Sequence, residues 1–168
     1  MEQQGRTLIA ATLAASLAAS TLIAAPARAT PSSGFAGTQI SRGLFGELNL
    51  NADKSGTWDL KLKTKANSDV YVTRNAIAVG GQSGWHTHPG PSLITVTVGA
   101  ITVYEGDNPA CAPTVYRAGE QGSIDIGSGH SHLIRNESGA PAETVAVQFV
   151  PAGADRRIDM PKPTNCEF

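Results

Sequence analysis

The chain has 168 residues, enough for one domain, and carries 13 basic and 14 acidic side chains with a formal net charge of −1. It contains no run of basic residues and no aromatic–basic stacking pattern, so nucleic acids and anionic membrane surfaces are poor candidates for partners. Aromatic residues make up only 5% of the chain, so aliphatic side chains must fill most of its core.

The first 29 residues predict a secretory signal peptide. One basic side chain, Arg6, precedes an uncharged stretch over residues 8–25, and Ala27-Arg28-Ala29 is a small-x-small cleavage signal. An uncleaved membrane anchor is the alternative, but many Ala, Ser and Thr residues make the stretch weakly apolar. Cleavage after Ala29 would leave 11 basic and 13 acidic side chains, because two basic residues and one acidic residue are removed. We therefore expect a secreted or periplasmic protein with no membrane attachment after cleavage.

Beyond residue 30 the patterns predict strands and no helix. Residues 57–65 alternate Trp58, Leu60 and Leu62 with polar side chains, which predicts a strand with these three facing inward. Residues 93–98 and 101–104 meet at Gly99-Ala100 and predict a hairpin. Further strands are expected over residues 69–79, 114–117, 123–126, 131–135 and 144–150.

Short strands separated by Gly- and Pro-rich turns predict an all-β sandwich or barrel. We divide the chain into the signal peptide, an N-terminal arm, one domain and a C-terminal tail. Their expected bounds are residues 1–29, 30–44, 45–155 and 156–168.

The two cysteines, Cys111 and Cys166, predict a disulfide, because an even cysteine count in an exported protein indicates an oxidised pair. The bond would tie a mid-chain loop to the C-terminal tail. Free or metal-binding thiols are the alternative, but neither cysteine has a Cys-x-x-Cys partner.

All four histidines lie in two His-x-His pairs, His86/His88 and His130/His132. Residues i and i+2 of a strand point to the same face, so each pair can form a two-pronged imidazole fork. Imidazole is the commonest protein ligand for transition metals. The pattern predicts a metal site assembled from distant strands.

The spacing around the histidines resembles the two motifs of the cupin superfamily, in particular the small single-domain cupins. In residues 80–99, Gly80 is followed by five residues, then by His86-x-His88, and Gly99 closes the motif. In the second motif, Gly129, His132 and Asn136 match, while the proline position holds Gly127. The resemblance covers residues 45–155 and implies a double-stranded β-helix, a jelly-roll barrel, with His86, His88 and His132 as metal ligands. It also implies a small-molecule substrate or ligand, and it leaves a homodimer open.

One departure concerns the fourth, anionic ligand of the family, a glutamate. Ser92 stands at that position, so the motif leaves three neutral imidazoles and up to three open coordination positions. A metal held in this way keeps its full divalent charge and favours anionic chelating ligands such as enolates, diketonates or catecholates. Cupins that similarly lack the glutamate include cysteine dioxygenases and diketone-cleaving dioxygenases.

Other roles stay open from the sequence. Three roles are open for His130. It is either a fourth metal ligand in place of the glutamate, a residue that hydrogen-bonds to the ligands, or a histidine of the loop before the strand. Trp85 is expected beside Ser92 at the site, mainly as packing at the barrel mouth, and Asn136 is expected to satisfy turn backbone. The catalytic residues are unknown, with Glu105, Asp125 and Glu143 as candidate general bases.

The expected cofactor is one divalent transition metal: Cu, Zn, Fe, Ni or Mn. Three imidazoles favour copper, then zinc or nickel, and manganese is the weakest binder. Three classes of function follow: a dioxygenase-like enzyme acting on a small chelating substrate, a non-redox isomerase, lyase or hydrolase, and a non-catalytic module that binds a small ligand or metal.

Overall fold

The computed structural model describes residues 29–52 and 56–168, so nearly all of the predicted signal peptide lies outside the described residues. In the described part the chain forms strands and no helix. None of those residues, accordingly, forms a helix that could cross a membrane. The prediction of an all-β fold is confirmed.

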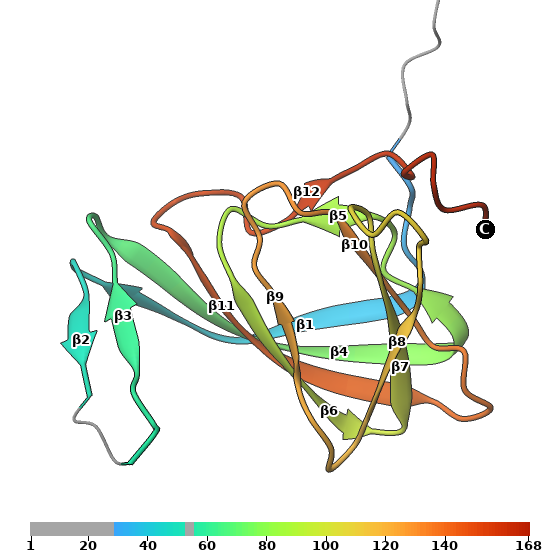
Figure 1. Ribbon diagram of the computed structural model, residues 1–168, viewed down its shortest axis with the longest axis horizontal. Coiled ribbons are helices and arrows are strands. Elements are labelled where there is room, and N and C mark those ends of the chain that lie inside the picture. Colours follow the sequence, from blue (N-terminus) through green and yellow to red (C-terminus); the bar gives the residue numbers. More distant parts are fainter. Residues whose placement is uncertain (1–28, 53–55) are drawn as a thin grey trace, which may run out of the picture.

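Ten strands form one antiparallel sheet that folds into two layers and nearly closes as a jelly-roll barrel (Figure 1). One layer has the order β1-β4-β11-β6-β9 and the other β12-β5-β10-β7-β8. They join where Arg135 of β10 pairs with Gln82 of β4. The strands are β1 (Ser33–Phe45), β4 (Ser68–Gln82), β5 (His86–Thr87), β6 (Ser92–Val98), β7 (Ala100–Glu105), β8 (Thr114–Arg117), β9 (Ser123–Asp125), β10 (His132–Arg135), β11 (Ala142–Pro151) and β12 (Ile158–Asp159).

Two apolar clusters form the core, on opposite faces of the β7–β10 pair. The larger cluster consists mainly of branched aliphatic side chains, as the scarcity of aromatic residues requires, and includes Ile77, Ile94, Val103 and Ile134. The second cluster contains Trp85, Tyr104, Cys111, Leu133 and Cys166. The predicted disulfide between Cys111 and Cys166 is present inside this second cluster. It fixes the C-terminal tail against the barrel.

The predicted strand over residues 57–65 is only partly formed, and its expected inward face is wrong. A small hairpin of β2 (Asn49–Asn51) and β3 (Lys61–Lys63) stands to one side of the barrel (Figure 1). Trp58 and Leu60 are 57% and 50% exposed. The alternation fails as a guide here because, among the described residues, β2 and β3 pair with each other and not with the barrel sheet.

The predicted hairpin at Gly99-Ala100 is also wrong. The strands on either side, β6 and β7, do not pair with each other: β6 pairs with β11 and β9, and β7 pairs with β10 and β8. Gly99 has φ +67, and a Cβ at this position would lie 2.6 Å from the carbonyl oxygen of Pro141. The turn therefore carries the chain from one layer to the other, which a glycine permits at low cost.

Residues assigned to an N-terminal arm form most of the long strand β1, which pairs along β4 from Ser33↔Gln82 to Phe45↔Ser68. Their sequence contains three glycines and few β-branched residues, so its local strand signal is weak. Pairing with a long neighbouring strand overrides that weak signal. The domain bounds themselves stay a prediction.

Candidate metal centre

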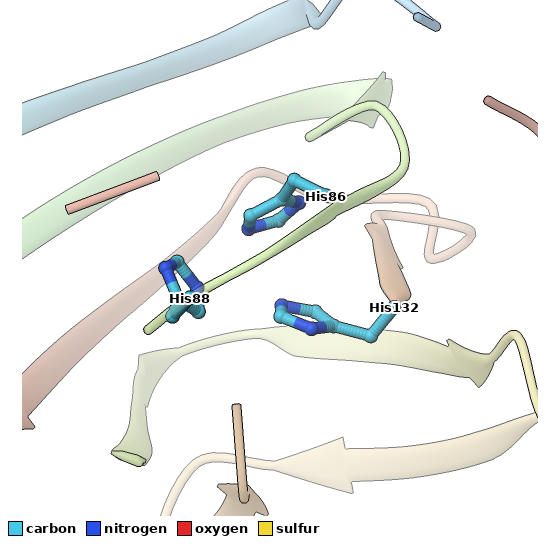
Figure 2. A group of neighbouring side chains, drawn as sticks. All are labelled: His86, His88 and His132. Atoms are coloured by element: carbon cyan, nitrogen blue, oxygen red, sulfur yellow. The ribbon is translucent and has the colours of Figure 1, made fainter. Parts of the chain in front are cut away.

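Strand register brings three of the four histidines together. His86 lies in β5, His88 follows just after that strand, and His132 begins β10, where it pairs directly with His86. The three side chains are buried, and one nitrogen of each ring lies within 4.8 Å of the others. Figure 2 shows the three rings converging on a common space. This cluster is a candidate site for one metal ion.

The hydrogen bonds of the rings fit a metal ion. Nδ1 of His86 lies 2.9 Å from the carbonyl oxygen of Gly84, and Nδ1 of His88 lies 2.6 Å from that of Arg156. When each Nδ1–H donates to its carbonyl, Nε2 is left with a free lone pair, as a metal ligand requires. Neither ring nitrogen of His132 has a hydrogen-bond partner, although both are buried. A buried imidazole without partners is costly, and a metal ion would satisfy it.

Burial keeps the three histidines neutral. Desolvation lowers the pKa of His86, of His88 and of His132, the last to about 3. The neighbouring imidazoles and Arg157 lower the pKa of His86 and His132 further. Neutral imidazole is the form that binds metal, so the site does not have to lose protons at neutral pH.

The depressed pKa values predict that the metal-free protein is acid-labile. Below the ordinary histidine pKa of 6.5 the unfolded chain takes up protons on these three histidines more readily than the folded chain does. Asp125 and Glu105 act in the opposite sense, because burial raises their pKa, to about 7 for Glu105. The histidines outnumber them, so the free energy of unfolding should fall as the pH falls below that pKa. Urea unfolding between about pH 7 and pH 5 tests this, and a flat or rising stability would contradict it.

The ring nitrogens face a cavity of about 250 Å³ at the open end of the barrel core. That volume is below the range of sites for drug-sized molecules, so it suits a small ligand. Its wall combines apolar side chains of the core with polar groups. The polar residues include Thr73, Asn75, Ser92, Gln148, Arg156 and Arg157.

Gln148 and Arg156 are site residues that the sequence reasoning missed. Gln148 is buried on the inward face of β11, with Nε2 3.0 Å from Nδ1 of His88. A polar residue in the inward phase of an alternating strand was the available signal. Arg156 gave none, because its position depends on β12 pairing with β5 beyond it.

The second histidine pair is divided between two environments. His130 lies outside the cluster, with Nδ1 2.8 Å from the carboxylate of Asp107 and a side chain that is 40% exposed. It lines a separate outer cavity of about 240 Å³, together with Glu105, Asp107 and Asp125. The His-x-His pair therefore contributes one group to the cluster and one to the outer surface.

The other predicted site residues fall in different places. Ser92 lines the inner cavity, whereas Trp85 packs in the second apolar cluster instead of lining that cavity. The side-chain amide of Asn136 donates to the carbonyl oxygens of Ile77 and Ala140, which confirms its turn role. Glu143 forms an ion pair with Arg74 at the surface. It does not line the inner cavity, so it is not placed to act as a general base at the cluster.

A family model of the cupin domain matches residues 74–148, the segment that contributes all three clustered histidines. The chain contains a cupin domain. The expected cupin barrel and the family resemblance are thereby confirmed. No curated protein matches this cupin at a significant level.

Solved structures similar to this cupin share limited identity with it. One is an uncharacterised double-stranded β-helix protein from Klebsiella pneumoniae, with 20% identity over 68% of this chain and 80% of that chain and a TM-score of 0.42. A polyketide cyclase from Streptomyces resistomycificus has 17% identity over 57% and 65%, with a TM-score of 0.44. An oxalate oxidase in complex with the substrate analogue glycolate has 26% identity over 47% of this chain and only 41% of its own, with a TM-score of 0.41.

Proposed function

We propose that this cupin is exported and binds one divalent transition metal through His86, His88 and His132. We further propose that it acts on a small, anionic, chelating organic molecule, with oxygenase-type oxidation as the leading reaction. The observation that carries the proposal is the partnerless, buried imidazole of His132 beside two imidazoles whose Nδ1 atoms are already engaged. A bound divalent ion would act there as a Lewis acid and, if redox-active, would support oxidation.

The histidine donor set also ranks the metals. Three imidazoles favour copper, with zinc and nickel next and iron and manganese weaker. Export supports this order, since a chain exported unfolded acquires its metal where ferrous iron is scarce. The disulfide between two buried cysteines is consistent with an oxidising, extracytoplasmic compartment.

The position of Arg156 favours an anionic ligand in the cavity. Its guanidinium lines the same cavity as the three histidines and donates from Nη1 to Oε1 of Gln148 at 2.8 Å. A guanidinium carries five N–H donors in a fork that suits a carboxylate or enolate. Arg157 is more fully engaged, since it donates to Asp159 and to the carbonyl oxygen of Ser83. Arg156 is therefore the group that we expect to orient the bound anion.

Replacing Arg156 tests the ligand class. We expect Arg156→Met to weaken binding of a small anionic chelator such as acetylacetonate by about 10- to 100-fold, because a charge-assisted hydrogen bond is lost. Arg156→Lys should recover part of the loss. Isothermal titration of the metal-loaded protein measures the affinity, with Arg157→Met as the matched control. Equal losses in the Met variants of Arg156 and Arg157 would contradict a specific role for Arg156.

Oxygen consumption tests the reaction class. Copper- or iron-loaded protein should consume dioxygen with at least one compound from a panel of catechols, diketones and 2-oxo acids. Conversion of a panel compound without oxygen consumption would instead indicate the non-redox alternative. The homodimer stays a prediction, to be checked by sedimentation.

A further inference from the structure

A buried carboxylate lies against the histidine cluster. Asp125, at the end of β9, is 4% exposed. Its Oδ2 lies 3.7 Å from Nε2 of His88, and its Oδ1 lies 3.6 Å from Nδ1 of His132. The side chain forms part of the wall between the histidine cluster and the outer cavity. It therefore approaches two of the three proposed ligands at once.

The hydrogen bonding of Asp125 leaves one oxygen unsatisfied. Oδ1 accepts the backbone N–H of Gly127 at 2.9 Å, whereas the buried Oδ2 has no hydrogen-bond partner. A buried carboxylate is normally paired or bound to a metal, because its desolvation is costly. The distance to His88 exceeds a hydrogen bond, and Asp125 lies outside the set of ligand atoms that are within 4.8 Å of one another. Two neighbouring donors about 2.1 Å from a metal lie about 3.0–3.4 Å apart, so coordination requires Asp125 to move toward the three imidazoles when the ion binds.

Strand register explains how this carboxylate reaches the site. Asp125 of β9 pairs directly with Ser92 of β6, the residue that replaces the glutamate of the cupin motif. Directly opposed residues of an antiparallel pair point to the same face with their Cβ atoms about 5 Å apart. The hydroxyl of Ser92 is buried and partnerless too. A carboxylate missing from one strand is thus available from its neighbour.

Charge balance favours the same conclusion. The cavity contains three neutral imidazoles and two guanidinium groups, those of Arg156 and Arg157. A divalent ion would add two further positive charges to this enclosed space. One buried carboxylate beside His88 offsets part of that charge, which makes a cation far less costly to hold there.

We propose that Asp125 is the fourth, anionic ligand of the metal held by His86, His88 and His132. This inference rests on the proposed metal site. With Asp125 coordinated, the site would carry one positive charge rather than two and, in octahedral geometry, two open positions rather than three. The remaining positive charge, together with Arg156 in the same cavity, would favour a small anionic chelating ligand.

Cobalt(II) binding to the full chain tests the role of Asp125. We expect Asp125→Asn, which keeps the shape and removes the charge, to weaken Co²⁺ binding by more than about 100-fold, beyond the usual effect of a group that only supports a ligand. The visible d–d absorption of bound Co²⁺ should also change in position and intensity. Asp107→Asn is the matched control, because it removes an exposed carboxylate from the same outer cavity and should leave both readouts unchanged.

The outcomes separate this inference from the metal site itself. If Asp125→Asn binds Co²⁺ as tightly as the wild type, or weakly with an unaltered spectrum, Asp125 is not a ligand and the inference is overturned. If the wild type fails to bind Co²⁺, the proposed function fails with it. Thermal unfolding of the metal-free Asp125→Asn protein establishes that the variant is folded. If Asp125→Glu also loses Co²⁺ affinity and shows the same spectral change as Asp125→Asn, the result would agree with a ligand position that only the shorter aspartate side chain fits.

Discussion

Removal of the disulfide should lower the free energy of unfolding by about 4 kcal/mol, the value expected for a crosslink between residues 55 positions apart. For a domain of this size that corresponds to a fall in melting temperature of about 10–20 °C. The bond matters because it closes a long loop and joins the C-terminal tail to the barrel through Cys111 and Cys166. The double variant Cys111→Ala/Cys166→Ala, unfolded with urea, measures the effect.

A packing contribution must be separated from that of the crosslink, because both cysteines are buried beside Trp85 and Leu133. Reduction of the wild-type protein breaks the crosslink and keeps both sulfur atoms. Reduced wild type should therefore lose most of the 4 kcal/mol expected for the crosslink, and the double variant slightly more. A loss below about 1 kcal/mol on reduction would show that the tail is held by β12 and its neighbours rather than by the bond.

His132→Ala should weaken binding of Zn²⁺ or Cu²⁺ by more than about 100-fold, because loss of a ligand exceeds the effect of losing a group that supports one. His132 has no other partner for its ring nitrogens, so few competing interactions are removed with it. Competitive titration against a chelator of known affinity measures the change.

The second histidine pair contains its own control. His130→Ala removes an imidazole two residues away that is exposed and paired with Asp107. We expect this change to alter metal affinity by less than about fivefold, since exposed ion pairs contribute under 1 kcal/mol. Similar large losses for His130→Ala and His132→Ala would mean that His130 is a ligand and that the site is a closed four-histidine shell.

The fold and the three clustered histidines could be predicted because both depend on local pattern. Repeated short strands with turn residues between them indicated the barrel, and the cupin motif placed His86, His88 and His132 at matching positions. Sequence patterns gave wrong predictions where the pairing of strands decides which way a side chain or a turn faces. The apolar alternation of Trp58 and Leu60 faces solvent, and Gly99 joins two layers rather than two paired strands.

The polar surroundings of the cluster could not be predicted for the same reason. Asp125 was one of three candidate general bases with nothing to single it out, because only the pairing of β6 with β9 brings it opposite Ser92. Arg156 reaches the cavity because β12, next along the chain, adds to the edge of β5. Their side chains carry no local spacing signal, so the motif alone does not reveal the carboxylate and the guanidinium beside the three histidines. The motif predicted the three clustered histidines, and the strand register supplied the groups around them.

The measurement that tests the account most directly is the metal content of the protein purified from its extracytoplasmic compartment and again after reconstitution, beside the His88→Ala variant. We expect one transition-metal ion per chain in the wild type and a large loss of metal in the variant. A wild-type protein that retains no transition metal after reconstitution would contradict it, whatever ligand the cavity then proved to bind.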